Sequence, residues 1–280
     1  MVMLIKIKMG HIVVAARARC GSQRIAAASV ARAAVGGVGV GLMLCVVELG
    51  IGRAAALAFA RQGDTVVVAG RREAEGKALE AEIKALGGEA LFVRTDVRHD
   101  DEVAALVAQT IARFGRIDAA VNAAGTEGQP GLIADQTAES YAATFDTNVL
   151  GTLLSMKHEI RAMQAQGHGN IVNVSSSFGQ RGAAYASVYA ASKHAVEGFT
   201  KSAALELARF GIRVMTIAPG VFWTPMVDGM PEAVQQSLAA SIPFPSRLGK
   251  PEDFASLVGF ILGNTYLNGE TIRLDGATRL

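Results

Sequence analysis

The chain has 280 residues, enough for one large α/β domain, and half of them are hydrophobic, so a sizeable core can be buried. The formal charge is +2, but the first 47 residues hold six basic residues and no acid, which leaves the rest at −4. A mildly acidic body gives no reason to expect nucleic-acid binding. Two cysteines and five scattered histidines indicate neither a disulfide framework nor a metal site. The small number of cysteines favours a reducing compartment, and we expect the cytoplasm.

Residues 1–47 are rich in Ala, Val, Gly and Arg and have no clear period. Four interpretations stay open: an organelle transit peptide, an anchor formed by the apolar run Ala33–Val47, a shifted reading frame of a GC-rich gene, or a disordered extension. The run Ala33–Val47 spans 15 residues, fewer than the roughly 20 that a membrane helix needs, so we expect no membrane partner. We treat 1–40 as an extension of doubtful structure and 41–280 as the folded domain.

From residue 41 onward, short β-branched runs alternate with segments of helical spacing. The expected strands are Gly41–Val47, Thr65–Ala69, Leu91–Arg94, Ile117–Asn122, Asn170–Val174, Gly211–Ile217 and Thr271–Leu274. The expected helices are Ile51–Arg61, Arg72–Leu86, Asp100–Phe114, Thr137–Gln164, Val188–Arg209 and Pro251–Leu262, with an irregular stretch after Pro219-Gly220. This alternation predicts βαβ units with right-handed crossovers. We therefore expect an α/β fold: a single-domain, Rossmann-like, doubly wound parallel sheet with helices on both faces.

A glycine turn follows the first expected strand. Gly50, Ile51 and Gly52 open a helix, where backbone N–H groups can approach a pyrophosphate. A helix start with small residues for packing would look the same. The second strand ends in Arg71 and Arg72, at the place where sites that prefer NAD usually have an acid. Two arginines can instead bind a 2′-phosphate, which favours NADP(H) and leaves NAD(H) open.

Tyr189 and Lys193 have the i, i+4 spacing that places a phenol and an ammonium on one helix face. An adjacent ammonium is expected to lower the pKa of the phenol, so that Tyr189 can exchange a proton with an alcohol or a carbonyl. Ser176 stands directly after an expected strand, and its hydroxyl can reach a substrate oxygen. These residues are the candidate catalytic group.

Three further segments follow strands or lie in the expected long helix. Asn122-Ala-Ala-Gly125 forms a small turn that can accept a flat ring, and Asn148 is placed to hold a water next to Lys193. Pro219, Gly220 and Thr224 follow the last long strand, where they can fix a carboxamide.

Taken together, these motifs over residues 50–280 resemble the short-chain dehydrogenase/reductase family in their order and spacing. The resemblance implies a catalytic tetrad of Asn148, Ser176, Tyr189 and Lys193, of which Tyr189 and Lys193 also contact the cofactor. It places Asp96 and Val97 near the adenine, Asn122 and Gly125 in the turn that supports the cofactor, and Thr224 against the nicotinamide. An NAD(P)-dependent oxidoreductase that transfers a hydride to or from a small carbonyl or alcohol is therefore expected.

The phosphate turn departs from the family pattern. The pattern's Thr and first Gly correspond to Cys45 and Val46, and a β-branched residue resists a positive φ. Glu48 also brings a negative charge to a phosphate site. Two explanations stay open: a cofactor-binding protein with impaired catalysis, or a first strand lost to a frame error upstream of Glu48.

The C-terminal motifs, from Gly211–Gly220 to Leu267–Gly276, resemble type II 3-hydroxyacyl-CoA dehydrogenases, a group that normally uses NAD. The Arg71 and Arg72 half resembles reductases that favour NADP instead, so the chain is either an intermediate or a hybrid. The segment Phe222–Ile242, with Trp223, is expected to form an apolar lid for an acyl chain or a flat ring. The family also implies a homo-oligomer, a dimer or a tetramer, that pairs through the long helices.

Overall fold

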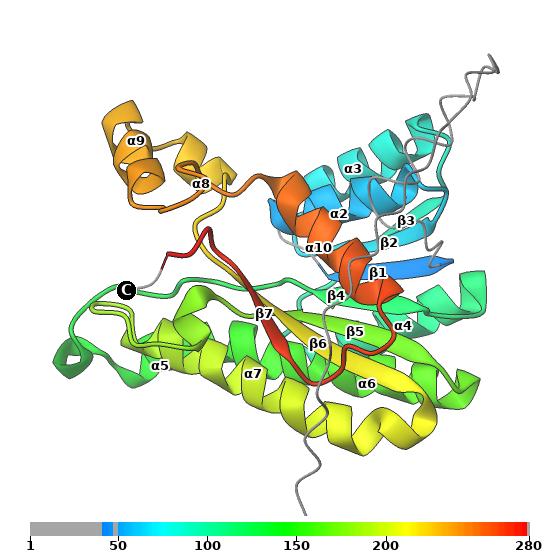
Figure 1. Cartoon of the computed structure of the whole chain (residues 1–280). Helices are drawn as coiled ribbons and strands as arrows, with labels where there is room; N and C mark the ends of the chain where they lie inside the picture. The colour runs from blue at the N-terminus through cyan, green and yellow to red at the C-terminus, as the bar shows by residue number, and fades with distance from the viewer. Residues whose placement is uncertain (1–40, 47–49, 279–280) are drawn as a thin grey trace, which may run out of the picture.

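Seven parallel strands form one sheet in the order β3-β2-β1-β4-β5-β6-β7, as the computed structural model shows for residues 41–46 and 50–278 (Figure 1). The chain builds outward from β1 to β3 and then continues from β4 on the other side of β1. The strand order therefore reverses between β1 and β4, the place where such sheets bind ligands at the carboxyl ends of their strands. The strands are β1 (Leu42–Val46), β2 (Thr65–Gly70), β3 (Ala90–Arg94), β4 (Ala119–Asn122), β5 (Gly169–Val174), β6 (Ile212–Pro219) and β7 (Thr271–Leu274).

Strand β1 lies inside the sheet, between β2 and β4. Met43 pairs with Val66 and Ala119, and Val46, its last residue, pairs with Ala69 and Asn122. Residues Leu42–Val46 of the run Ala33–Val47 thus lie in the sheet. No helix in the described ranges is long and apolar enough to cross a membrane. The interpretations placed on 1–40 and on Glu48 lie outside the described residues.

Helices cover both faces of the sheet, as expected (Figure 1). On one face, α2, α3 and α10 bury Phe59, Ile83 and Phe254 against the strands. On the other face, α4, α6 and α7 bury a second cluster that includes Leu106 and Met163. The helices of eight or more residues are α2 (Ile51–Ala60), α3 (Glu73–Ala85), α4 (Asp100–Phe114), α5 (Ala138–Phe145), α6 (Gly151–Gln166), α7 (Ser187–Leu207), α9 (Glu232–Ala240) and α10 (Pro251–Gly263).

The prediction of one continuous helix over Thr137–Gln164 is wrong in the middle of that range, where the α-helix is interrupted. The structure has α5, then a π-helical turn, η2 (Asp146–Leu150), and then α6. A π turn widens the helix by one residue, and such turns are frequent at functional sites. Here the turn carries Asn148, whose side chain bonds outside its own helix.

The stretch after Pro219-Gly220 is more ordered than expected. It contains a short helix, α8 (Pro225–Asp228), followed by α9. Val227, Ile242 and Leu248 form a small hydrophobic cluster of their own, separate from the two main clusters. The expected lid is therefore a small packed unit beside the end of β6.

Candidate active site

The three side chains expected to carry the chemistry meet beside the carboxyl end of β5. Ser176 follows that strand by two residues, and Tyr189 and Lys193 lie in the first two turns of α7. Lys193 Nζ donates a hydrogen bond to the Val174 carbonyl oxygen at 3.0 Å and lies 5.7 Å from the centre of the Tyr189 ring. The fold therefore brings together residues that are up to 17 positions apart in the sequence.

Burial perturbs both titratable groups of this trio. It lowers the pKa of Lys193 to about 8, because the buried ammonium loses its contact with water. The pKa of Tyr189 is raised, first by burial, and the carboxylate of Glu127 adds to the rise while a hydrogen bond with Ser176 opposes it. This direction is opposite to the lowering expected from Lys193, since desolvation of the phenol is the largest influence on its pKa.

Asn148 joins this group through the loop after β4. Its Oδ1 accepts from the Thr126 N–H at 2.8 Å, and its Nδ2 donates to the Thr126 carbonyl at 2.8 Å and to Ser192 Oγ at 2.9 Å. Both amide hydrogens are thus used within the protein. Thr126 and Ser192 were missed in the sequence, although each directly neighbours a motif residue.

Gly125 fits between Asn148 and Lys193. A Cβ on Gly125 would lie 3.3 Å from Asn148 Oδ1 and 3.3 Å from Lys193 Nζ. A side chain at this position would press on both polar groups, so the absence of a side chain lets the turn approach them.

The segment that carries Ser176 is attached to α7 by a second buried contact. Ser175 Oγ lies 3.1 Å from both the Lys193 carbonyl and Glu197 Oε1. Ser176 Oγ accepts from the Phe178 N–H at 3.2 Å. The Ser176 hydroxyl and the Tyr189 helix are therefore held together by neighbours that the sequence pattern did not point to.

The glycine turn lies where a phosphate site is expected. Gly50 precedes α2 with φ +123°, a conformation that favours glycine, and the first turn of α2 has no acid and no side-chain cap. A Cβ on Gly50 would lie 3.6 Å from Thr224 Cγ2, so the turn and the segment after β6 are neighbours. Pro219 ends β6, and a Cβ on Gly220 would come within 2.7 Å of Asp275 Cβ.

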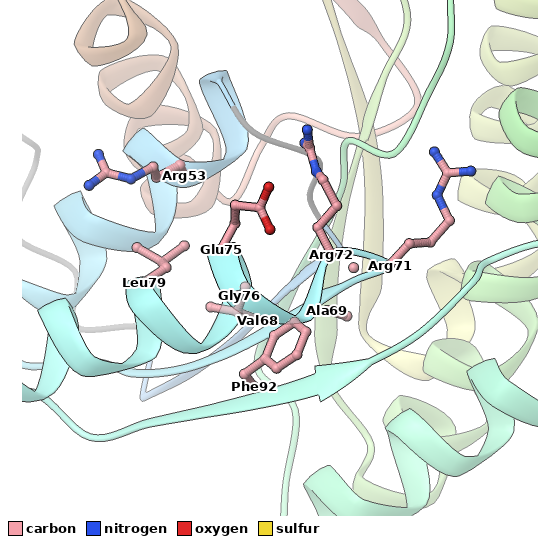
Figure 2. A pocket seen from close by; sticks show the side chains of 10 residues that line it. Arg53, Val68, Ala69, Arg71, Arg72, Glu75, Gly76, Leu79 and Phe92 are labelled. Carbon is pink, nitrogen blue, oxygen red and sulfur yellow. The ribbon is translucent and has the colours of Figure 1, made fainter. Parts of the chain in front are cut away.

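A pocket lies at the end of β2, between α2 and α3. Arg71 and Arg72 stand at the strand end, and Figure 2 shows Glu75 between Arg72 and Arg53. Phe92 of β3 forms part of the floor. Arg53 also forms an ion pair with Glu82. Both arginines expected at the 2′-phosphate thus line one pocket together with a third arginine.

Asp96 lies just past β3, at the same edge of the sheet. Arg98 binds its carboxylate with both Nε (3.0 Å) and Nη2 (2.6 Å), which lowers the pKa of Asp96 to about 2; the nearby Arg71 contributes to this lowering. Val97 is buried, and Gly151 packs closely against it. The expected adenine neighbour is therefore already paired with a cation.

Asn122 ends β4 between the glycine turn and the catalytic candidates. Its Nδ2 donates to Asn173 Oδ1 at 3.1 Å and to Glu159 Oε2 at 3.0 Å. Glu159 was not singled out in the sequence. The sequence signal for Glu159 was its helical spacing, three residues after Met156 and four before Met163, which places it on the same buried face of α6.

A family model described as "Enoyl-(Acyl carrier protein) reductase" matches residues 46–277, which is most of the chain and includes every candidate site residue. This chain belongs to the short-chain dehydrogenase/reductase family. It is therefore an oxidoreductase of a family that uses NAD(P) and acts on CH–OH groups.

Curated relatives and solved structures agree with this family. The human 3-hydroxyacyl-CoA dehydrogenase type-2 is 38% identical over 247 residues, covering 82% of this chain and 92% of that protein. The crystal structure of levodione reductase has a TM-score of 0.79 at 32% identity and covers 85% of this chain and 96% of that one. ElxO with NADP bound matches with a TM-score of 0.79, 29% identity and coverage of 85% and 97%. The likeness thus spans both halves of the domain.

Proposed function

We propose that this short-chain dehydrogenase/reductase interconverts a secondary alcohol and a ketone with Tyr189 as the acid–base residue. The observation that carries the proposal is the convergence of Ser176, Tyr189 and Lys193 beside β5. In reduction, Tyr189 gives its proton to the carbonyl oxygen while Ser176 holds that oxygen by a hydrogen bond. Lys193 supplies positive charge next to the phenol, and Asn148 fixes the loop that packs on Lys193.

We infer that the chain holds a nicotinamide dinucleotide, which supplies or accepts the hydride. The uncapped, acid-free start of α2 supports a pyrophosphate at Gly50, Ile51 and Gly52. The remaining contacts proposed are Asp96 and Val97 at the adenine, Asn122 and Gly125 beneath the dinucleotide, Tyr189 and Lys193 at the ribose, and Pro219, Gly220 and Thr224 at the nicotinamide.

NADP(H) is the proposed form of the cofactor. The pocket shared by Arg53, Arg71 and Arg72 supports this preference, because guanidinium groups bind a 2′-phosphate by charge-assisted hydrogen bonds. The NADP found in ElxO, whose structure resembles this chain, is consistent with it. NAD(H) is the alternative, and the resemblance to 3-hydroxyacyl-CoA dehydrogenases supports it.

A 3-hydroxyacyl-CoA or a hydroxysteroid-like alcohol is the proposed substrate class. The named activities of the relatives, on hydroxyacyl-CoA and on the cyclic ketone levodione, support it. So does the segment from Phe222 to Ile242, which carries Trp223, 41% exposed, and contributes Val227 and Ile242 to a small hydrophobic cluster. An apolar side chain exposed beside a site favours an apolar acyl chain or ring.

Steady-state reduction of 3-oxoacyl-CoA and of a ketosteroid, with NADPH and with NADH, tests the proposed reaction. We expect turnover by the wild type and a loss of about 10²-fold to 10⁴-fold in Tyr189→Phe, with cofactor affinity kept. Full activity of Tyr189→Phe would remove Tyr189 from its role.

A cofactor-binding protein with impaired catalysis is the second candidate. It is favoured by Val46, which is the last residue of β1 at the position of the pattern's first glycine. This candidate predicts an intact fold without turnover on any of these substrates. Val46→Gly would then gain turnover, whereas in an active enzyme the same change would alter it little.

Assembly, domain limits and location are also proposals. We infer one Rossmann-like domain over 41–280 after an extension at 1–40, in a cytoplasmic homo-oligomer without a nucleic-acid or membrane partner. Exposed apolar side chains on neighbouring helices support assembly: Tyr141 of α5 is 51% exposed and Leu205 of α7 is 84% exposed. Light scattering is expected to give a dimer or a tetramer, and a stable monomer would contradict it.

A further inference from the structure

A row of buried polar side chains runs beneath the Asn122–Gly125 turn, from α6 across β4 and β5 to α7. It links Glu159, Asn122, Asn173 and Thr200, none of which is more than 4% exposed. Asn122 Nδ2 donates to Glu159 Oε2 and to Asn173 Oδ1, and Asn173 Nδ2 donates to Thr200 Oγ1 at 3.0 Å. Because both hydrogens of the Asn122 amide have acceptors, the orientation of that amide is fixed by the row.

At the α6 end of this row, two buried oxygen atoms lack hydrogen-bond donors. Glu159 Oε1 and Asn122 Oδ1 are both buried, and neither has a hydrogen-bond partner. Both atoms are acceptors if Glu159 is ionised, so the carboxyl and the amide lack one donor between them. Buried polar atoms without partners are rare and costly, and a single proton on Glu159 would supply the missing donor.

The surroundings of Glu159 disfavour a charge. Burial raises the pKa of its carboxyl to about 7, and the hydrogen bond from Asn122 is the influence that opposes the rise. An isolated buried carboxylate is expensive and usually becomes neutral instead. Asn122 Nδ2 already donates to Glu159 Oε2 at 3.0 Å, so the carboxyl and the amide are direct neighbours.

We propose that Glu159 is a neutral carboxylic acid in the folded protein, and that it donates its proton from Oε1 to Asn122 Oδ1. The acid and the amide then form a pair of hydrogen bonds, one in each direction. Glu159 is thus a positioning residue that acts through Asn122: it fixes the start of the turn, while Asn148 fixes its end through Thr126. The effect on cofactor affinity rests on the proposed function; the protonation does not.

Infrared spectroscopy of the full-length protein at pH 6 tests the protonation directly. Glu159→Gln keeps the shape and supplies an amide donor to Asn122 Oδ1, and Glu206→Gln, on the exposed face of α7, is the control. We expect a carbonyl band of a protonated carboxyl group in the wild type and in Glu206→Gln, and its loss in Glu159→Gln. Identical spectra of the wild type and Glu159→Gln in this region would overturn the proposal.

Fluorescence titration with NADPH tests the positioning role. We expect Glu159→Gln to bind within about twofold of the wild type, and Glu159→Met, which leaves the Asn122 amide unpaired, to bind about tenfold more weakly. Equal weakening in both variants would show that a carboxylate is required and would overturn the proposal. If the wild type binds no nicotinamide cofactor, the proposed function fails, while the infrared comparison still decides the state of Glu159. If Glu159→Met does not fold, the infrared comparison of the wild type with Glu159→Gln still tests the proposal.

Discussion

Gly125 lies against Lys193: a Cβ on Gly125 would be 3.3 Å from the lysine Nζ and equally near Asn148 Oδ1. The turn after β4 and the start of α7 therefore meet at a point where an added methyl group would be tightly placed. This contact connects the proposed cofactor turn to the proposed acid–base residue, because Tyr189 is one helical turn before Lys193.

Gly125→Ala is expected to displace Lys193 Nζ and Asn148 by a few tenths of an ångström. We predict a loss of about 10-fold to 100-fold in kcat, since small displacements at a reacting centre are costly. Gly198→Ala is the matched control: it lies on the same helix as Lys193 with nothing within 4 Å of the added Cβ, and alanine is the better helix former. Equal loss in both variants would contradict the contact's role.

Lys193→Met tests what this buried ammonium costs the fold. Since burial lowers its pKa to about 8 from 10.5, the unfolded chain binds the proton more tightly between those values, and the free energy of unfolding rises with pH there. Below pH 8 the buried Lys193 is protonated, and the full cost of burying its charge reduces the free energy of unfolding. We predict that Lys193→Met is inactive but more stable at pH 7, by about 1–3 kcal/mol, and that the gain shrinks towards pH 10. Denaturant unfolding at both pH values measures this, and a less stable variant at pH 7 would contradict it.

Glu127→Gln is expected to change the pH profile of alcohol oxidation. Oxidation needs the deprotonated phenol, and the Glu127 carboxylate contributes to the raised pKa of Tyr189. Removing that charge lowers the pKa, so the rising limb of the profile moves to lower pH. Glu139→Gln, an exposed change on α5, is expected to leave the profile in place. A limb that moves to higher pH in Glu127→Gln would exclude this electrostatic effect.

Arg213 fixes α10 to the sheet. From β6, its guanidinium donates to four carbonyl oxygens at and after the end of α10, those of Ile261, Leu262, Asn264 and Leu267, at 2.8–3.2 Å. Arg213→Met would leave these acceptors without their donor, and we predict a loss of about 2–4 kcal/mol in the free energy of unfolding. Arg61→Met, an exposed arginine just past α2, is the control. Chemical denaturation compares the two.

The sheet and its helices were predictable because their signals are local. Runs such as Thr65–Gly70 are apolar over the length of one strand, and the alternation with helices leaves few topologies. The meeting of Ser176, Tyr189 and Lys193 followed from the same logic, since each stands just after a strand or on the helix that follows it.

Contacts between distant segments were not predictable. The π turn at Asp146–Leu150 carries Asn148, which accepts a hydrogen bond from Thr126, 22 residues earlier, and no local spacing indicates such a contact. The raised pKa of Tyr189 arises from burial and from Glu127, neither of which the tyrosine–lysine spacing contains. In the sequence, Glu159 is indicated only by its helical spacing from two methionines of α6, Met156 and Met163, and nothing local shows its contact with Asn122.

Cofactor binding by the full-length wild type is the most direct test of the central claim, that this chain is an NADP(H)-dependent enzyme despite Val46. NADPH and NADH are titrated separately and nicotinamide fluorescence is followed, with an Arg71→Ala, Arg72→Ala double variant beside the wild type. The account predicts tighter binding of NADPH, by about tenfold or more, and loss of that preference in the double variant. Binding of neither cofactor, or tighter binding of NADH by the wild type, would contradict it.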